Sequence, residues 1–395
     1  MRNYLRKPVT VIIILFLLIS ASCPSEPEPY IYDDINRAGY SPNAQRLLSY
    51  LSDQYGNKII SGQMDTAWTT NNEMDMISRV YNDTGKYPAL KGFDMMELPQ
   101  SWTNYGRQQI DEAIEWWDGK NNNEKLLPDK PDIHGIVTFC WHWRTPNQFY
   151  YKDRNLSSNT SFRIPWKDGK LDIESDAFKN TIISDLDKAA ALLQILKEKD
   201  IPVLWRPLHE AAGDSRYPGS GGWFWWGAND VSEPASRYKA LWEFMYDYLG
   251  NGKGLNNLIW VWNGQNAEWY PNPDTVDIAG YDVYTNASTP QTARNYSSQK
   301  ARFTETLRMV PNQNRMVALT ENGAIPDPDE CIKDDAMWLW FCTWNDSQRD
   351  NQLDGADNRD NFWAGEYHNT NAHKNHVYNH ELIITLDKLP DLTRY

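Results

Sequence analysis

Eight short apolar segments recur along the chain, and each ends in polar or aromatic side chains. Their apolar residues are continuous rather than alternating, which is typical of strands buried on both faces of a parallel sheet. The eight segments are Lys58–Asp65, Tyr87–Met96, Ile133–Trp143, Ile201–Glu210, Asn257–Asn263, Val276–Tyr284, Arg315–Gly323 and Met337–Asp346. We therefore predict eight parallel strands.

Helical periodicity separates many of these segments. It is clearest over Asn180–Lys199, where the apolar residues fall on one helix face. Further helices are predicted at Asn104–Trp117, Glu233–Leu249, Gln299–Met309 and Val377–Leu389. The interval between Trp260 and Tyr281 is short and contains two prolines, which argues against a full helix there. Eight strands with interposed helices predict an α/β fold, a single (β/α)₈ TIM barrel.

The first 36 residues do not belong to the predicted barrel. Arg2, Arg6 and Lys7 precede an apolar run, which is the layout of a secretory signal. Cys23 follows small residues, as in bacterial lipoprotein signals where that cysteine is acylated, so residues 1–22 are predicted to be a signal peptide. Ordinary cleavage to a soluble secreted protein is the alternative. Residues 23–36 are read as an acidic, proline-rich tether, and residues 37–395 as the barrel domain.

These assignments predict where the protein resides. An acylated Cys23 would hold the chain at the cell envelope through its lipid alone. The acidic tether resembles tags that display some lipoproteins on the outer surface, so we expect an outer-membrane location with possible surface exposure. We expect a monomer.

Charge and composition narrow the choice of ligand. The net charge of −14 becomes −17 without the three basic residues of the predicted signal, which disfavours nucleic acid because binding it requires a basic surface. Apart from Cys23, three cysteines are too few for a disulfide framework. The 19 tryptophans and 22 tyrosines exceed what a core is expected to need, and aromatic faces stack on sugar rings. A carbohydrate ligand is therefore favoured.

The barrel prediction places the functional groups at one end of the molecule. Active sites of (β/α)₈ barrels lie at the C-terminal ends of the strands. Each predicted strand carries a polar or aromatic residue at that end, namely Gln63 and Asp65, Asp94, His142, His209 and Glu210, Asn263, Tyr284, Glu321, and Trp344. We expect these side chains to face one opening.

Glu210 and Glu321 end the fourth and seventh predicted strands, which face one another across the barrel. Two carboxyl groups about 5 Å apart allow glycoside cleavage with retained configuration, one as nucleophile and one as acid. Arg206, which strand alternation places on the same face as Glu210, is expected to reach the nucleophile, although a purely structural ion pair is an alternative. Tyr284 is expected to donate to Glu321, and both contacts would favour its ionised form.

Four motifs carry a resemblance to a known family. "RPLHE", "GGWFWWG", "GYDVY" and "LTENG" resemble glycoside hydrolase family 26, chiefly β-mannanases, over nearly the whole chain beyond the signal. The resemblance implies that Glu210 is the acid/base and Glu321 the nucleophile. It also implies that His142 and Trp344 surround the −1 sugar, that Trp223 lies toward the +1 sugar, and that Tyr284 contacts the nucleophile. Asp94, Arg206 and His209 complete the expected substrate-binding set.

The resemblance implies hydrolysis of β-1,4-mannosidic bonds in mannan, glucomannan or galactomannan, with no cofactor. A β-glucanase or β-xylanase on the same scaffold and a non-catalytic glycan-binding protein are the alternatives. The sequence departs from the family in the longer segment Ala211–Gly222, which leaves an open groove and a chain-end-directed cleft both possible.

Two further clusters receive structural interpretations. In the run Trp223–Trp226, alternation predicts that about half of the side chains are packing and half face the ligand. The four histidines His368, His373, His376 and His380 have metal-like spacing. We read their segment as a polar loop entering the last helix, and we predict no metal there.

Overall fold

A computed structural model describes most of the chain beyond its first 38 residues. The described residues are 39–65, 75–96, 98, 103–119, 129–145, 148–151, 159–213, 222–285, 288–346 and 359–395. All of them belong to one compact unit, Tyr32–Tyr395. The predicted signal peptide, the acylated Cys23 and the tether lie outside the described residues.

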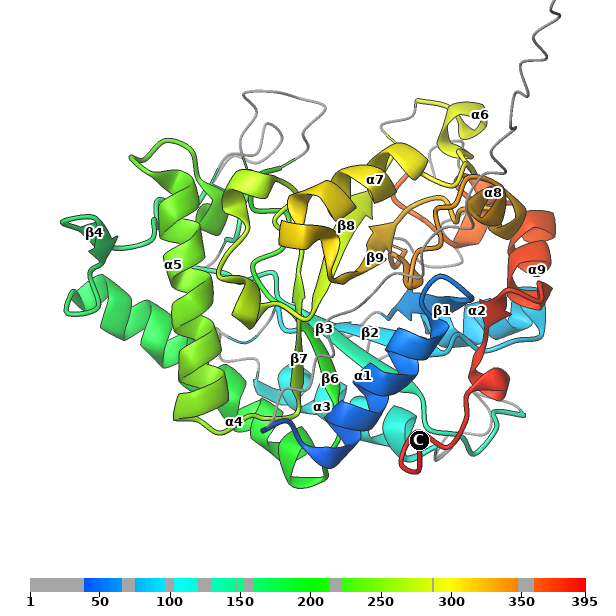
Figure 1. Ribbon diagram of the computed structural model, residues 1–395, viewed down its shortest axis with the longest axis horizontal. Helices are drawn as coiled ribbons and strands as arrows, with labels where there is room; N and C mark the ends of the chain where they lie inside the picture. Colours follow the sequence, from blue (N-terminus) through cyan, green and yellow to red (C-terminus); the bar gives the residue numbers. More distant parts are fainter. Residues whose placement is uncertain are drawn as a thin grey trace, which may run out of the picture. The chain divides into compact units, whose positions relative to one another are not determined.

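Eight parallel strands close into a barrel, which confirms the predicted (β/α)₈ fold (Figure 1). Neighbouring strands pair in sequence order, and β10 pairs with β1 through the register Ile60 with Trp340 to close the ring. Each predicted segment contains one strand. The strands are β1 (Ile59–Met64), β2 (Leu90–Asp94), β3 (Ile136–Cys140), β6 (Val203–Arg206), β7 (Leu258–Trp262), β8 (Ile278–Val283), β9 (Met316–Asn322) and β10 (Trp340–Thr343).

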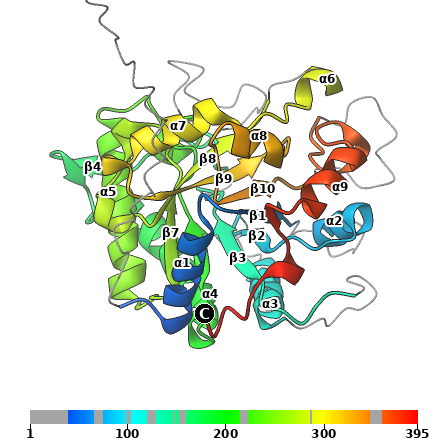
Figure 2. The same cartoon turned by 45° about the vertical axis from the view of Figure 1, so that its right-hand side comes forward.

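Helices surround the barrel (Figures 1 and 2). They are α1 (Pro42–Gln54), α2 (Met76–Thr84), α3 (Thr103–Asp118), α4 (Ser184–Glu198), α5 (Pro234–Tyr246), α6 (Pro290–Ala293), α7 (Lys300–Met309), α8 (Pro328–Lys333) and α9 (Asn371–Asn379). A π-helical turn, Phe178–Ile183, precedes α4, and another, Asp247–Gly252, follows α5. A two-stranded hairpin, β4 (Trp166–Lys167) with β5 (Lys170–Leu171), lies outside the barrel. No helix among the described residues has the length and apolar character needed to cross a membrane.

Short turns replace a helix between β7 and β8. Between β7 and β8 the chain forms only the 3₁₀ turns Ala267–Trp269 and Pro273–Thr275, as the two prolines predict. Other 3₁₀ turns are Trp225–Gly227, Pro311–Gln313, Ala364–Glu366 and Leu386–Lys388.

The prediction of a last helix over Val377–Leu389 is wrong. Helix α9 begins earlier because the Thr370 side chain caps it by accepting from the His373 backbone N–H. At His380 the backbone becomes extended, and β11 (Ile383–Ile384) then pairs with the start of β1. The polar segment for which the sequence predicts a loop is therefore the helix, and the apolar residues after it extend the sheet.

Most of the tryptophans are buried in the core. Eleven of the twelve largest fully buried side chains are tryptophans, which weakens the inference from tryptophan number to a sugar ligand. They are Trp141, Trp143, Trp205, Trp225, Trp226, Trp242, Trp260, Trp262, Trp338, Trp340 and Trp363. Trp223 and Trp344 are only partly buried, so these two retain surface that a ligand can reach.

Candidate active site

Three buried carboxyl groups meet at the C-terminal end of the barrel. One oxygen each of Glu210, Asp282 and Glu321 lie within 4.8 Å of one another. Arg206, at the end of β6, donates from Nη1 to Asp282 Oδ2 at 3.0 Å and from Nη2 to Glu321 Oε1. The expected contact between Arg206 and Glu321 is present, and the guanidinium bridges two of the three acids.

The backbone after β6 brings Glu210 to this site by a turn. The sequence predicts that Arg206 and Glu210 share one face of an extended strand, but β6 ends at Arg206. Leu208 and Glu210 both have φ of 52°, in the left-handed region that costs energy for residues other than glycine. The Glu210 N–H donates to the Asn263 carbonyl at 2.7 Å, so the chain after β7 holds the turn in place.

Two glycines flank the residue that follows Glu210. A side-chain carbon at Gly222 or at Gly227 would collide with the carbonyl oxygen of Ala211. The Ala212 N–H in turn donates to the Gly264 carbonyl at 3.1 Å. The backbone next to Glu210 is therefore enclosed by main chain on several sides, and only glycine fits at these two positions.

Asp282 is a site residue that the sequence reasoning missed. Its Oδ1 accepts from Asn263 Nδ2 and from Thr320 Oγ1, both at 2.6 Å, and its Oδ2 accepts from Arg206. Gln265 fixes its backbone by accepting from the Asp282 N–H at 3.0 Å. Two-residue alternation with the predicted inward Tyr284 was the signal that could have placed Asp282 inside the barrel.

Glu321 lies on β9 between two donors. Tyr284 donates its hydroxyl to Glu321 Oε2 at 2.6 Å, while Arg206 donates to the other oxygen. Both contacts lower the pKa of Glu321, as expected, and His142 adds to this effect. Burial and the Asp282 carboxylate outweigh them, and together raise the pKa of Glu321 to about 7.

Glu210 has fewer stabilising partners for its ionised form. Burial raises its pKa well above the ordinary glutamate value, and the charges of Asp282 and Glu321 raise it further. Arg206 and the indole N–H of Trp223, which donates to Glu210 Oε2 at 2.9 Å, act in the opposite direction. The site therefore favours a proton on Glu210, and Arg206 together with Tyr284 stabilises charge on Glu321.

The aromatic run after the turn does not alternate as expected. Only Trp223 is partly exposed, whereas Phe224, Trp225 and Trp226 are buried. Trp225 donates to the Trp143 carbonyl at 2.7 Å, and Trp226 donates to the His209 carbonyl at 2.8 Å. Because this segment forms a 3₁₀ turn rather than a strand, three of the four rings pack behind the site.

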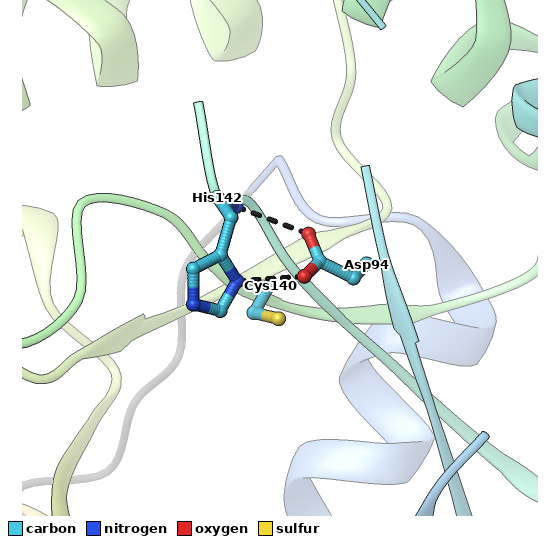
Figure 3. Close-up of side chains that lie close together, drawn as sticks. All are labelled: Asp94, Cys140 and His142. Atoms are coloured by element: carbon cyan, nitrogen blue, oxygen red, sulfur yellow. Dashed lines mark hydrogen bonds and ion pairs between the residues drawn. The ribbon is translucent and has the colours of Figure 1, made fainter. Parts of the chain in front are cut away.

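His142 and His209 lie beside the acids, and Asp94 contacts His142 directly. The ring Nδ1 of His142 is 2.6 Å from Asp94 Oδ2, and its backbone N–H donates to Asp94 Oδ1 at 3.0 Å (Figure 3). The Nε2 atoms of His142 and His209 are 3.2 Å apart. Burial, His142 and Arg206 all lower the pKa of His209 well below its ordinary value, so its ring is neutral. The Trp344 ring lies 5.5 Å from His142 between centroids.

Two other predicted strand-end residues have structural contacts. Gln63 donates to the backbone carbonyls of Thr343 and Trp344, at 3.1 and 3.3 Å. Asp65 pairs with Lys91 at 2.8 Å and accepts from the Met76 N–H at the start of α2. Neither side chain belongs to the group of acids around Arg206.

The four histidines near the C-terminus do not converge. His368 and His373 contact backbone carbonyls, His373 with that of Ile325 at 2.8 Å. His376 and His380 do lie within 4.8 Å of Asp329, on α8. However, the Leu382 N–H donates to His380 Nδ1, which places the ring proton on Nε2, the atom that faces Asp329. A cation would have to displace that proton.

A second group with metal-ligating atom types includes Asp94, Cys140 and His142, whose potential ligand atoms lie within 4.8 Å of one another. His142 Nδ1 is already bonded to Asp94, and Figure 3 shows no such bond to the Cys140 sulfur. Burial and the Asp94 charge raise the pKa of the Cys140 thiol well above its ordinary value, which disfavours the thiolate that metals require.

Comparison with known proteins identifies the family. The sequence model of glycosyl hydrolase family 26 matches residues 38–388. The chain belongs to this family. The resemblance inferred from the four motifs is therefore confirmed for the family, while a lipoprotein form is not part of that match.

Individual relatives of this family 26 chain are mannanases by name. A mannan endo-1,4-beta-mannosidase of Thermothelomyces thermophilus is 32% identical over 94% of the chain and 66% of its own length. Mannan endo-1,4-beta-mannosidase B of Piromyces sp is 32% identical over 88% of the chain and 52% of its own length. The chain thus spans between about half and two thirds of these relatives.

Solved structures agree with this assignment. The Podospora anserina GH26-CBM35 beta-(1,4)-mannanase has a TM-score of 0.66 and 32% identity, and the match covers 94% of the chain and 72% of that protein. A beta-mannanase from a symbiotic protist of the termite Reticulitermes speratus, solved with gluco-manno-oligosaccharide, has a TM-score of 0.67 and 28% identity, covering 89% and 96%.

Proposed function

We propose that this family 26 chain is a retaining glycoside hydrolase that cleaves β-1,4-mannosidic linkages in mannan, glucomannan or galactomannan. One observation carries the chemistry. Oxygens of Glu210 and Glu321 lie within 4.8 Å of each other. Retaining enzymes hold their two carboxyl groups about 5 Å apart, whereas inverting enzymes leave about 6.5–9.5 Å for a water molecule.

In the first step, Glu321 attacks the anomeric carbon while Glu210 donates its proton to the departing oxygen. Arg206 and Tyr284 orient the two oxygens of Glu321. The product is a glycosyl ester on Glu321, and the leaving sugar carries the proton away. The raised pKa of Glu210 keeps that proton available near neutral pH.

In the second step, water attacks the same carbon and transfers a proton to Glu210, which restores both side chains. Ester formation removes the charge of Glu321, one of the charges that raise the pKa of Glu210. The pKa of Glu210 therefore falls in the intermediate, which suits it to act as a base. The same residue serves as acid and then as base because its neighbour's charge changes between the steps.

The mannan preference is supported by the relatives rather than by a single contact. Two of the relatives that this chain resembles are named mannan endo-1,4-beta-mannosidases. One solved neighbour carries a gluco-manno-oligosaccharide. Trp223, which is bonded to Glu210, and Trp344, which packs on His142, are partly exposed indole rings on which pyranose rings can stack.

The test is reducing-sugar release from mannan, glucomannan, galactomannan, β-glucan and xylan. Wild-type protein is expected to act on the mannose-containing chains, and Glu321→Ala is expected to abolish release. Asp277→Asn is a matched control. Asp277 is a buried acid directly before β8, and it accepts from the Tyr40 hydroxyl and the Trp260 N–H rather than from residues of the site. Preferred hydrolysis of β-glucan or xylan would refute the mannan assignment. Binding to mannan without release would instead indicate a glycan-binding protein.

The sizes of the products over time distinguish an open groove from a cleft that acts on chain ends. Mixed oligosaccharides that appear early from a long mannan would indicate an open groove, and a single short product would indicate chain-end action. The inserted segment Ala211–Gly222 is the element to shorten in that second case, since it follows Glu210 directly.

We also propose that Cys23 is acylated and anchors the protein at the outer membrane, on the basis of the signal-like sequence before it. The test is incorporation of labelled fatty acid in the wild type and in Cys23→Ser. Loss of label and release of the variant from the membrane fraction are expected. Equal membrane association of both proteins would refute the anchor.

A further inference from the structure

Both carboxylate oxygens of Asp94 contact the same residue, His142. Oδ1 accepts from the His142 backbone N–H at 3.0 Å, and Oδ2 faces the His142 ring Nδ1 at 2.6 Å (Figure 3). Asp94 is itself fixed by Gln109 on α3, whose side-chain oxygen accepts from the Asp94 N–H at 2.9 Å. All three side chains are buried. An acid held in this way has little capacity left for a sugar hydroxyl.

The contact determines where His142 carries its proton. A carboxylate only accepts hydrogen bonds, so Nδ1 must carry hydrogen whether the ring is neutral or charged. In the neutral ring the lone pair is then on Nε2, 3.2 Å from Nε2 of His209. Opposite this lone pair, the neutral His209 donates from its Nε2, so its Nδ1 carries no hydrogen.

The surroundings of His209 fit this proton arrangement. Its Nδ1 is buried without a hydrogen-bond partner among the described residues. A buried acceptor without a partner is tolerated more often than a buried N–H without one. The tautomer without hydrogen on Nδ1 therefore avoids a buried N–H that has no acceptor, which is the more costly case. One chain of contacts thus runs from Gln109 on α3 through Asp94 and His142 to His209, the residue before Glu210.

We propose that Asp94 is a positioning residue, which fixes the tautomer and orientation of His142 and, through it, of His209, and that Asp94 does not bind the sugar. This inference rests on the proposed function and replaces the sequence-based prediction of Asp94 as a substrate ligand. The orientation matters because the His142 ring packs edge-on against Trp344 and Phe224 and contacts His209, the residue before Glu210.

Asp94→Asn tests the tautomer directly. The amide keeps the shape and its oxygen still accepts from the His142 N–H, but its NH₂ group then faces Nδ1. The His142 proton must move to Nε2, and the His209 proton must move to Nδ1. Ring ¹⁵N NMR of histidine-labelled protein, with His142→Gln for assignment, is expected to show both tautomers exchanged in Asp94→Asn. An Nε2–H tautomer of His142 in the wild type would overturn the proposal.

Kinetics test the functional consequence. An orienting carboxylate is commonly worth about 10- to 100-fold or more, so kcat of Asp94→Asn on a manno-oligosaccharide is expected to fall at least about tenfold. KM is expected to change by less than about threefold, because no sugar contact is lost. A large rise in KM with kcat unchanged would show instead that Asp94 binds the sugar. Asp277→Asn, the control acid, is expected to leave both constants and both tautomers unchanged.

A double-mutant cycle separates positioning from an independent role. If Asp94 acts only through His142, Asp94→Asn costs little further activity in a His142→Gln background. Losses that multiply would overturn the proposal. The NMR measurement needs no substrate, so it decides the tautomer even if the wild type released no sugar, which would refute the proposed function instead.

Discussion

Trp223 donates its indole N–H to Glu210 Oε2 across 2.9 Å, and it is the only partly exposed ring of the four consecutive aromatic residues. The same side chain therefore offers a face toward the solvent side of the site and a polar contact to the acid. Under the proposed function, Trp223 would couple binding of the sugar to the proton affinity of Glu210.

Trp223→Phe should keep an aromatic face but remove the N–H. Trp223 lowers the pKa of Glu210, so its loss raises that pKa further and keeps Glu210 protonated to higher pH. The alkaline limb of kcat/KM is expected to move up by roughly one pH unit, the size of one hydrogen bond to a charged group. A pH profile on a soluble manno-oligosaccharide measures this. An unchanged or lowered alkaline limb would contradict it.

The acid limb of the same profile should report Glu321. The nucleophile must be ionised, and burial with the Asp282 charge raises its pKa to about 7. We therefore expect kcat/KM to fall as pH drops below about 7, approaching tenfold per unit. Arg206→Lys should move this limb upward because Arg206 lowers the pKa of Glu321. An acid limb near pH 4 in the wild type would show that the donors to Glu321 outweigh burial.

Glu210→Gln should abolish turnover and stabilise the fold. The folded pKa of Glu210 lies well above the ordinary value of 4.5, so its ionisation costs stability. That cost is absent below about pH 4.5, grows as pH rises toward the folded pKa, and is constant above it. The variant is expected to gain about 1–2 kcal/mol near pH 8 and little at pH 4. Thermal unfolding at both pH values measures the gain, and an equal or larger gain at pH 4 would contradict it.

The free energy of unfolding should fall far more when the charge of Arg206 is removed than when the arginine is replaced by lysine. Arg206→Met leaves Asp282 and Glu321 buried without their shared cation, and removal of one partner from a buried ion pair costs about 3–5 kcal/mol. Arg206→Lys keeps the charge but not the planar two-pronged contact, so a smaller loss of about 1–2 kcal/mol is expected. Denaturant unfolding of both variants measures the difference. Equal losses would show that geometry, not charge, dominates.

Strand-end reasoning could predict the barrel and the pair of acids because both depend on local patterns. Continuous apolar runs locate all eight strands, and topology then brings Glu210 and Glu321 to the same opening. The contact of Tyr284 with Glu321 was also accessible, since both follow directly from strand positions. The roles of these residues in turnover stay predictions.

Other features depended on contacts or capping signals that the apolar pattern of the strands does not carry. The turn at Leu208 and Glu210 is held by backbone bonds from the chain after β7, so alternation failed there. Asp282 was overlooked because its importance comes from Arg206, distant in sequence. Helix α9 was placed too late because capping by Thr370, rather than an apolar stripe, sets its start.

Gly222 and Gly227 enclose the Ala211 carbonyl so closely that the main chain on both sides of the inserted segment is fixed by contact. A longer or shorter insert between Gly213 and Gly222 then adds only a modest closure entropy, which grows with the logarithm of its length. The length of that stretch can therefore change while the neighbouring Glu210 keeps its place. The two glycines thus separate the length of this segment from the position of Glu210.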